Sequence, residues 1–365
     1  LGTVEKNHLL VRYSGQFSIE ELSYTDQLEK MENIFVQMHE FEPGEITSAY
    51  EPYLTMICDG FRRYMTGTFE EFMEECDVYY LHRPVLLGYF NRGYAKREEI
   101  ILLDEVAYEQ ERMLAALERM LYAIADRHPV LLILNRFQLA SKSTMQLTAR
   151  ILKAENSNIG LVLGVSDIQA MPEFLVPDWE MLYETLDDGS KIYHIGNSGR
   201  KKEEIADDGK YADYGSEKVY RKLQNMVEFL DFDQAAYYLE VIERKIKFDN
   251  LFVDDPARFR MWLLFAKVSI LRKDIPKALE ICEDLEKIHL AGREDECAYE
   301  QDYLIATAYM YQGKLKEALE MAGETYRIAE KISDDYRKFL SELLKTQIQM
   351  SGWYNIFFCA QDVKI

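Results

Sequence analysis

The chain has 365 residues, of which 48% are apolar and 29% charged, which is ordinary for a soluble globular protein with room for two or three domains. Its formal charge of −21 argues against a nucleic-acid surface, because phosphate binding needs clustered Lys and Arg. No apolar run reaches the roughly 18 residues that cross a bilayer. We therefore expect neither nucleic acid nor a membrane as the partner.

The cysteines and histidines also exclude classes of protein. Five cysteines are scattered along the chain without a CxxC pair, which favours buried free thiols in the cytoplasm over a disulfide framework. The histidines show neither HExxH nor a paired helical spacing, so we expect no metal site and no cofactor. The chain begins with Leu1 and lacks a signal-peptide pattern, and we expect it to be a piece of a longer protein.

Residues 1–200 carry the pattern of an α/β domain. A helix is predicted at residues 50–64, and a strand at 8–13. Another helix is predicted from the apolar period of residues 113–124, and Pro129 must end it because proline lacks an amide N–H. Residues 76–104 are apolar and aromatic without a clear period, and no fold is predicted for them.

A strand–helix–strand unit follows Pro129. Residues 130–134 form a continuous apolar run, as expected of a strand covered on both faces. Ser141 or Ser143 can cap a helix that reaches residue 152, and a second apolar run covers 159–165. A crossover of this length predicts a parallel pair inside an α/β sheet.

The end of the first of these strands resembles a known family. The sequence at this strand end is Leu134-Asn135-Arg136-Phe137-Gln138-Leu139-Ala140-Ser141. It resembles the Walker B region of the signal-transduction ATPases, the family of the maltose-regulon activator, in which an apolar strand ends in two acidic residues before an apolar-Gln-apolar-Ala-Asp stretch. The resemblance covers residues 45–170. It implies an ATPase-like domain ahead of helical repeats, in a signalling protein whose output domain lies outside this chain.

The departures from that family concern the chemistry. Asn135 and Arg136 stand where Mg²⁺ needs one carboxylate and the hydrolytic water needs another. No GxxxxGK[ST] phosphate loop is present either. We therefore expect a degenerate parallel-sheet, P-loop-like domain without ATPase activity. One alternative is an ATP-driven switch whose phosphate loop lies upstream of Leu1, and another is a purely structural platform for the repeats.

Residues 201–215 are predicted to be a linker. Residues 216–365 are predicted to form helical hairpins that resemble tetratricopeptide repeats. A turn is followed five residues later by alanine at three places, and these alanines lie 42 and 40 residues apart: Ala236, Ala278 and Ala318. A fourth turn is predicted at residues 351–353, from which we expect the array to continue in the parent protein. A plain helical bundle is the alternative. Asp254-Asp255 is interpreted as a helix cap rather than as calcium ligands.

The repeat register predicts a groove that binds a protein or peptide. In tetratricopeptide arrays the first helix of each hairpin lines the concave face that holds the partner. This register places basic, aromatic and aliphatic residues inward, which favours an acidic, partly apolar ligand. The inward residues are Lys218, Arg221, Asn225, Phe229, Arg260, Leu263, Lys267, Leu271, Tyr303, Thr307, Met310 and Tyr311.

Overall fold

The computed structural model describes residues 8–13, 34–42, 44–95, 105–154, 158–165, 171–187, 191–195, 214–249 and 251–362. The chain divides into two compact units. The first contains Leu1–Asp213 and Arg221–Gln234, and the second contains Tyr214–Tyr220 and Ala235–Ile365. Residues 221–234 thus belong with the sheet, whereas the sequence suggested a single change of domain at 201–215. Most of that predicted linker lies outside the described residues.

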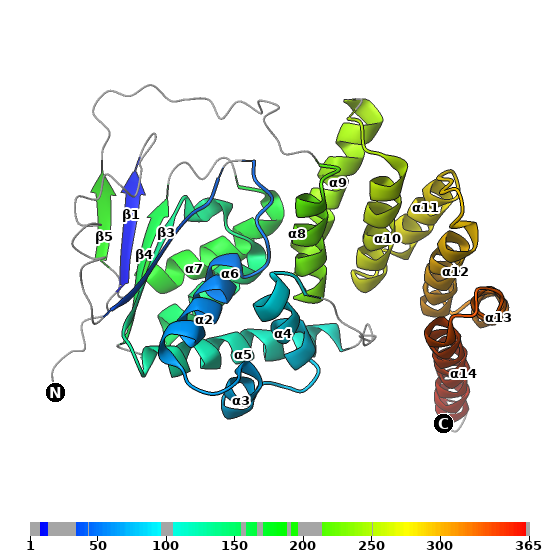
Figure 1. Cartoon of the computed structure of the whole chain (residues 1–365), viewed down its shortest axis with the longest axis horizontal. Helices are drawn as coiled ribbons and strands as arrows, with labels where there is room; N and C mark the ends of the chain where they lie inside the picture. Colours follow the sequence, from blue (N-terminus) through cyan, green and yellow to red (C-terminus); the bar gives the residue numbers. More distant parts are fainter. Residues whose placement is uncertain are drawn as a thin grey trace. The chain divides into compact units, whose positions relative to one another are not determined.

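The described strands form one parallel sheet in the order β2-β3-β4-β1-β5 (Figure 1). The strands are β1 (His8–Tyr13), β2 (Phe35–Glu40), β3 (Val130–Asn135), β4 (Ile159–Val165) and β5 (Lys191–Ile195). The predictions of β1, β3 and β4 are confirmed. The sequence pattern predicted neither β2 nor β5.

β3 and β4 are the predicted parallel pair, with Val130 opposite Ile159. β3 is buried along almost its whole length, as a strand covered on both faces requires. The crossover between the two strands contains helix α6 (Lys142–Lys153), which begins after Ser141. The Oγ atom of Ser141 accepts a hydrogen bond from the N–H of Thr144, so Ser141 rather than Ser143 is the cap.

Helices cover one side of this sheet in Figure 1. They are α2 (Glu51–Tyr64), α5 (Val106–Ala125), α6 and α7 (Val176–Asp187). α2 and α5 confirm the helices predicted at residues 50–64 and before Pro129. Short 3-10 turns, η2 (Phe137–Leu139) and η4 (Glu173–Leu175), follow β3 and precede α7.

The segment without a sequence period, residues 76–104, contains the short helix α4 (Arg83–Arg92), and another short helix, α3 (Phe69–Glu75), ends just before it. α3 begins with a capping box, in which Thr68 and Glu71 bond each other's main-chain N–H. α4 ends at Gly93, whose φ of 73° is the left-handed conformation that favours glycine.

The described residues from 214 onward form helices and short connecting segments without a strand, which confirms the α-helical prediction for this half. The helices are α8 (Glu217–Glu228), α9 (Phe232–Phe248), α10 (Asp255–Leu271), α11 (Ile275–Leu285), α12 (Glu294–Tyr311), α13 (Leu315–Lys331) and α14 (Asp335–Asp362). α10 packs on α11, α12 on α13, and α13 on α14. The three alanines of the predicted register are buried. Asp254 caps α10 by accepting from the N–H of Ala257 at 2.8 Å, as predicted.

Three hairpin turns share one geometry. Leu230, Lys273 and Gly313 follow the first helix of each pair with φ angles of 68°, 65° and 76°. In each turn the next residue's N–H bonds the carbonyl five residues earlier, at 2.7, 2.8 and 3.0 Å: Asp231 to Met226, Asp274 to Ser269 and Lys314 to Tyr309. These bonds define the Schellman ending of a helix. The repeated geometry supports the repeat period found in the sequence.

The predicted fourth turn at residues 351–353 is wrong, because α14 continues through it to Asp362. Gly352 suggested a turn by analogy with Gly313. A single glycine costs a helix interior only about 1 kcal/mol relative to alanine, so a glycine alone does not end a helix.

Candidate functional site

Asn135 and Arg136 occupy the two positions where the Walker B resemblance requires acids. Asn135 is the last residue of β3 and is buried, and its Oδ1 accepts a hydrogen bond from the N–H of Arg136 at 3.0 Å. Arg136 has a φ of 52° and starts the η2 turn. The amide of Asn135 therefore stabilises the turn that leaves the strand.

The guanidinium of Arg136 pairs with acidic residues beside the end of β2. It lies 3.4 Å from the carboxylate of Glu40 and 3.2 Å from that of Glu42. β2 and β3 are neighbours in the sheet, and Glu40 is opposite Asn135. Carboxylates at this edge suit Mg²⁺, but a guanidinium beside them repels a cation. Within the described ranges, no group of three His, Cys, Asp or Glu residues is arranged to hold a metal ion.

Sequence reasoning missed these two glutamates. The resemblance places the family's two acids at Asn135 and Arg136 alone, and the sequence pattern does not predict the strand that carries Glu40. The pattern His39-Glu40-Phe41-Glu42, in which acids alternate with ring-bearing residues, is the signal that marks the end of a strand here.

A second basic side chain holds the segment between β2 and α2. The Nζ of Lys222 lies 2.7 Å from Glu45 and 3.7 Å from Glu51, and it donates to the carbonyl of Ile46 at 3.0 Å. Burial lowers the pKa of the nearby His39. The ion pairs and the hydrogen bond of Lys222 therefore hold the segment between β2 and α2 in place.

The N-terminus of α6 is held by the turn between α8 and α9. Asp231, which is buried, accepts from the N–H of Ser143 at 3.0 Å, and Lys142 pairs with Asp233 at 2.5 Å. Burial raises the pKa of Asp231 to about 6, although the hydrogen bonds from Ser143 and the charge of Lys142 oppose the shift. A helix N-terminus favours such a carboxylate acceptor.

The predicted groove residues of α10 share one face of that helix. Arg260, Leu263, Lys267 and Leu271 are exposed or half-buried, whereas most of the other residues of α10 are buried. Arg260 pairs with Glu217 at 2.8 Å and lies 4.8 Å from the ring centroid of Tyr220. Lys218, which precedes Tyr220 by two residues, is exposed. We define Arg260, Leu263, Lys267 and Leu271 as the α10 stripe.

On α12 the predicted groove residues differ in burial. Tyr303, Thr307 and Tyr311 are half-buried. Met310 is instead buried in a cluster with Ala318 and Ala322, so the prediction that it faces a ligand is wrong. At the period of 40, Met310 is equivalent to Ile270, which is also buried, and the predicted set therefore mixed two faces of the helix.

The inward residues of α8 hold another segment of the first unit. Asn225 accepts from the N–H of Ala95 at 2.9 Å and donates to the carbonyl of Gly93 at 3.3 Å. The guanidinium carbon of Arg221 lies 4.8 Å from the ring centroid of Tyr94, the residue between Gly93 and Ala95. Phe229 is buried. Its ring packs edge-on at 6.3 Å from the ring of Tyr50 and 5.7 Å from that of Tyr89.

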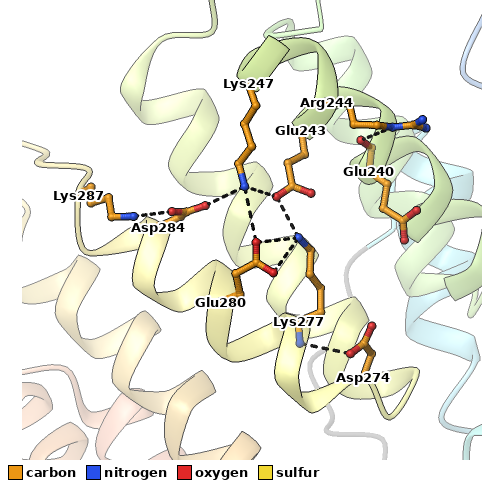
Figure 2. A network of polar contacts seen from close by, with 9 residues as sticks. All are labelled: Glu240, Glu243, Arg244, Lys247, Asp274, Lys277, Glu280, Asp284 and Lys287. Carbon is orange, nitrogen blue, oxygen red and sulfur yellow. Dashed lines mark hydrogen bonds and ion pairs between the residues drawn. The ribbon is translucent and has the colours of Figure 1, made fainter.

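Figure 2 shows a charge network between α9 and α11. Lys247 lies 2.7 Å from Glu243 and 3.4 Å from Asp284, and Lys277 lies 3.0 Å from Glu243 and 3.2 Å from Glu280. The hydrogen bond that Lys247 donates to Glu243 raises the pKa of Lys247. Because acids and bases alternate across the contact, this network holds two helices together rather than offering one sign of charge to a ligand.

Comparison of the sequence and the structure with family models, curated proteins and solved structures found no match. Among the described residues, no helix is both long enough and apolar enough to span a membrane. The described thiols of Cys58, Cys76, Cys282 and Cys297 are free and buried, as predicted. The resemblance to signal-transduction ATPases therefore rests on the residues quoted above.

Proposed function

We propose that this chain is a non-catalytic interaction module, which holds an extended segment of a partner protein on the exposed faces of its hairpin helices. The α/β unit serves as a degenerate, ATPase-like platform that does not hydrolyse nucleotides. Both parts follow the resemblance to signal-transduction regulators.

The observation that carries the proposal is the contact of Asn225 with residues 93–95. One side-chain amide bonds both a main-chain N–H and a main-chain carbonyl of that segment. Such a contact recognises a polypeptide backbone without regard to its side chains. Asn225 precedes Lys267 by 42 residues, the repeat distance of the first two hairpins. The α10 stripe is thus equivalent in sequence to residues that already hold a peptide segment.

The chemistry of the α10 stripe favours an acidic, partly apolar ligand. Arg260 and Lys267 supply positive charge in a chain with a net charge of −21, and Leu263 lies between them. The pair of Arg260 with Glu217 is a half-exposed ion pair, which contributes little and is readily exchanged for a ligand carboxylate. Tyr303 and Tyr311 of α12 are half-buried against the cluster that contains Met310, and tyrosine is a residue type enriched in binding hot spots.

Selection of peptides from a random display library on the intact chain tests this function. We expect enriched sequences that combine acidic and apolar residues and that lose binding to the double variant Arg260→Glu/Lys267→Glu. The matched control is Lys316→Glu/Arg327→Glu, which gives the same net charge through exposed residues of α13. Enriched peptides that bind all three proteins equally would refute the proposal.

The non-hydrolysing platform is supported by the pairing of Arg136 with Glu40 and Glu42. Titration with a fluorescent ATP analogue in the presence of Mg²⁺ tests it. We expect no saturable, magnesium-dependent binding. Tight binding that EDTA abolishes would instead favour the ATP-driven switch.

A further inference from the structure

Strand β2 lies at one end of the strand order and is therefore an edge of the sheet. The N–H groups of Phe35 and Phe41 bond main-chain carbonyls just before and at the end of β3, at 2.8 and 3.1 Å. Since successive residues of a strand direct their main-chain groups to opposite sides, Val36, Met38 and Glu40 direct theirs away from β3. Within the part of the chain that the structure describes, these outward N–H and C=O groups form no hydrogen bond.

This edge lacks the usual protection against pairing. Proteins normally protect an edge strand with lysine, proline, a bulge or a covering segment. β2 has the sequence FVQMHE, which contains neither lysine nor proline, and all its residues after Phe35 are half-buried. Such an edge is a template for a second strand, which gains main-chain hydrogen bonds by adding to the sheet.

The start of β2 is basic. The guanidinium carbon of Arg63 lies 5.3 Å from the ring centroid of Phe35, the first residue of the strand. The ring of Tyr64 stacks on that of His128 at 4.0 Å, which brings Arg63 and Arg127 to the same end of the sheet. Both arginines are exposed, and neither forms an ion pair with another described residue.

The end of β2 is acidic. Glu40 and Glu42 share the single guanidinium of Arg136, which leaves an excess of negative charge. An antiparallel strand with the same order of charge would meet the opposite charge at both of its ends. A second copy of this chain supplies such a strand.

We propose that β2 pairs antiparallel with β2 of a second copy of the chain, so that the two sheets continue as one across a two-fold axis. A two-fold contact uses the same surface on both copies, and the order of charge along β2 suits this requirement. With the axis at Met38, this residue is opposite Met38 of the second copy, and Val36 is opposite Glu40. This register pairs all the outward main-chain groups of the three residues.

The net charge of −21 on each copy opposes association. Salt screens this repulsion, because the Debye length is about 8 Å at an ionic strength of about 0.15 M, which is the condition for the experiments below. The inference goes beyond the peptide-binding function and does not depend on the α10 stripe, so the two proposals can fail separately.

Oxidative cross-linking of the intact chain tests the register. Opposite residues in a hydrogen-bonded antiparallel pair have Cα atoms about 5.5 Å apart, a distance that a disulfide spans. Met38→Cys should therefore form a covalent dimer in a Cys359→Ser background, in which the other cysteines are buried. Val36→Cys in the same background is the matched control, because the register places its two copies four residues out of step. Equal cross-linking of both variants, or none of Met38→Cys, would overturn the inference.

Sedimentation equilibrium over about 1–100 μM chain measures the association itself. We expect a reversible dimer for the wild type. Met38→Pro should weaken it about tenfold or more, because proline removes an outward N–H without removing a bond to β3. A wild type that stays monomeric over this range, or a dimer that Met38→Pro leaves unchanged, would contradict the pairing of β2. A monomeric wild type whose β2 edge binds a library peptide, with loss of binding in Met38→Pro, would show that another protein takes the edge.

Charge reversal keeps the test valid if proline disturbs the fold, because the changed residues are exposed. Arg63→Glu/Arg127→Glu should weaken the dimer, since both ends of β2 would then be acidic. Adding Glu42→Lys to this variant should strengthen the dimer again. Lys316→Glu/Arg327→Glu makes the same change in net charge on α13 and should dimerise like the wild type. Equal dimerisation of all these proteins would exclude the ends of β2 from the contact and overturn the inference.

Discussion

The side-chain amide of Asn225 accepts a hydrogen bond from the main-chain N–H of Ala95 at 2.9 Å, across 130 positions of sequence. Both residues are buried. The same amide bonds the carbonyl of Gly93, so one side chain fixes the end of α4. This contact is the internal model for how the hairpin helices hold an extended segment.

Removing this amide tests the contact. Asn225→Ala should lower the free energy of unfolding of the first unit by about 1–3 kcal/mol, because the buried N–H of Ala95 loses its acceptor. Asn225→Asp retains an acceptor for the N–H of Ala95. If only this bond contributes, Asn225→Asp should lower the free energy of unfolding less than Asn225→Ala does. Trp179 lies in the first unit, so its fluorescence in a Trp262→Phe/Trp353→Phe background follows that unit alone. An Asn225→Ala variant as stable as the wild type would show that the contact contributes nothing.

Asp231 should make the first unit's stability depend on pH. Its folded pKa of about 6 is above that of an unfolded aspartate, so the folded state binds the proton more tightly. Its contribution is therefore fully present below about pH 4 and is lost as the pH rises through 6. Asp231→Asn keeps an acceptor for Ser143 and cannot ionise. We expect its stability relative to the wild type to increase between pH 4 and pH 7, by on the order of 1–3 kcal/mol. A difference that is constant over this range would contradict the assignment.

The hairpin turns offer a matched pair of substitutions. Lys273 and Gly313 occupy the same left-handed position, with φ angles of 65° and 76°. Glycine adopts this conformation without the steric cost of a Cβ atom, so Lys273→Gly should stabilise the second unit by about 0.5–1 kcal/mol. Gly313→Lys should destabilise it by a similar amount. Urea denaturation followed by Trp262 in a Trp179→Phe/Trp353→Phe background measures both, and changes of the same sign would contradict the shared turn geometry.

The buried alanines test the packing of the hairpins. Ala278 and Ala318 are fully buried between helices. Ala278→Leu and Ala318→Leu should each destabilise the second unit by about 1–3 kcal/mol, because extra methyl groups overpack a close contact. Ala291→Leu, in the exposed turn between α11 and α12, is the control and should change little. Unchanged melting temperatures for both buried variants would exclude the helix faces described above.

Restoring acids at the end of β3 should not create an ATPase. Asn135→Asp/Arg136→Asp supplies the Walker B carboxylates, but the sequence still has no GxxxxGK[ST] phosphate loop. The variant should also be less stable by about 1 kcal/mol, because Glu40 and Glu42 would face another carboxylate. Phosphate release in the presence of ATP and Mg²⁺ is the measurement. Sustained release by this variant, with none from Asn135→Asp/Arg136→Met, would contradict the account.

Local pattern predicted much of the fold. β3, α6 and β4 followed from two apolar runs and a serine cap, and the hairpins followed from three alanines at a regular spacing. β2 was missed because five of its six residues are only half-buried, which weakens the apolar signal. α4 was missed because its buried and exposed residues do not follow one helical face. The α14 turn was predicted from a single glycine, which is too weak a signal to end a helix.

The candidate site was less predictable, because its contacts join distant parts of the chain. The α10 stripe follows from helical spacing within one helix. The partner of Asn225 does not, since residues 93–95 carry no motif. The pairing of Arg136 with Glu40 depends on two strands being neighbours, which their separate sequences do not reveal.

The most direct test of the central claim is a calorimetric titration of one selected acidic, partly apolar peptide into three intact proteins. We predict saturable binding to the wild type and to Lys316→Glu/Arg327→Glu, with affinity that falls as salt is raised. Arg260→Glu/Lys267→Glu should bind about tenfold more weakly or not at all. Equal affinities for the wild type and Arg260→Glu/Lys267→Glu would contradict the claim that the α10 stripe holds a partner.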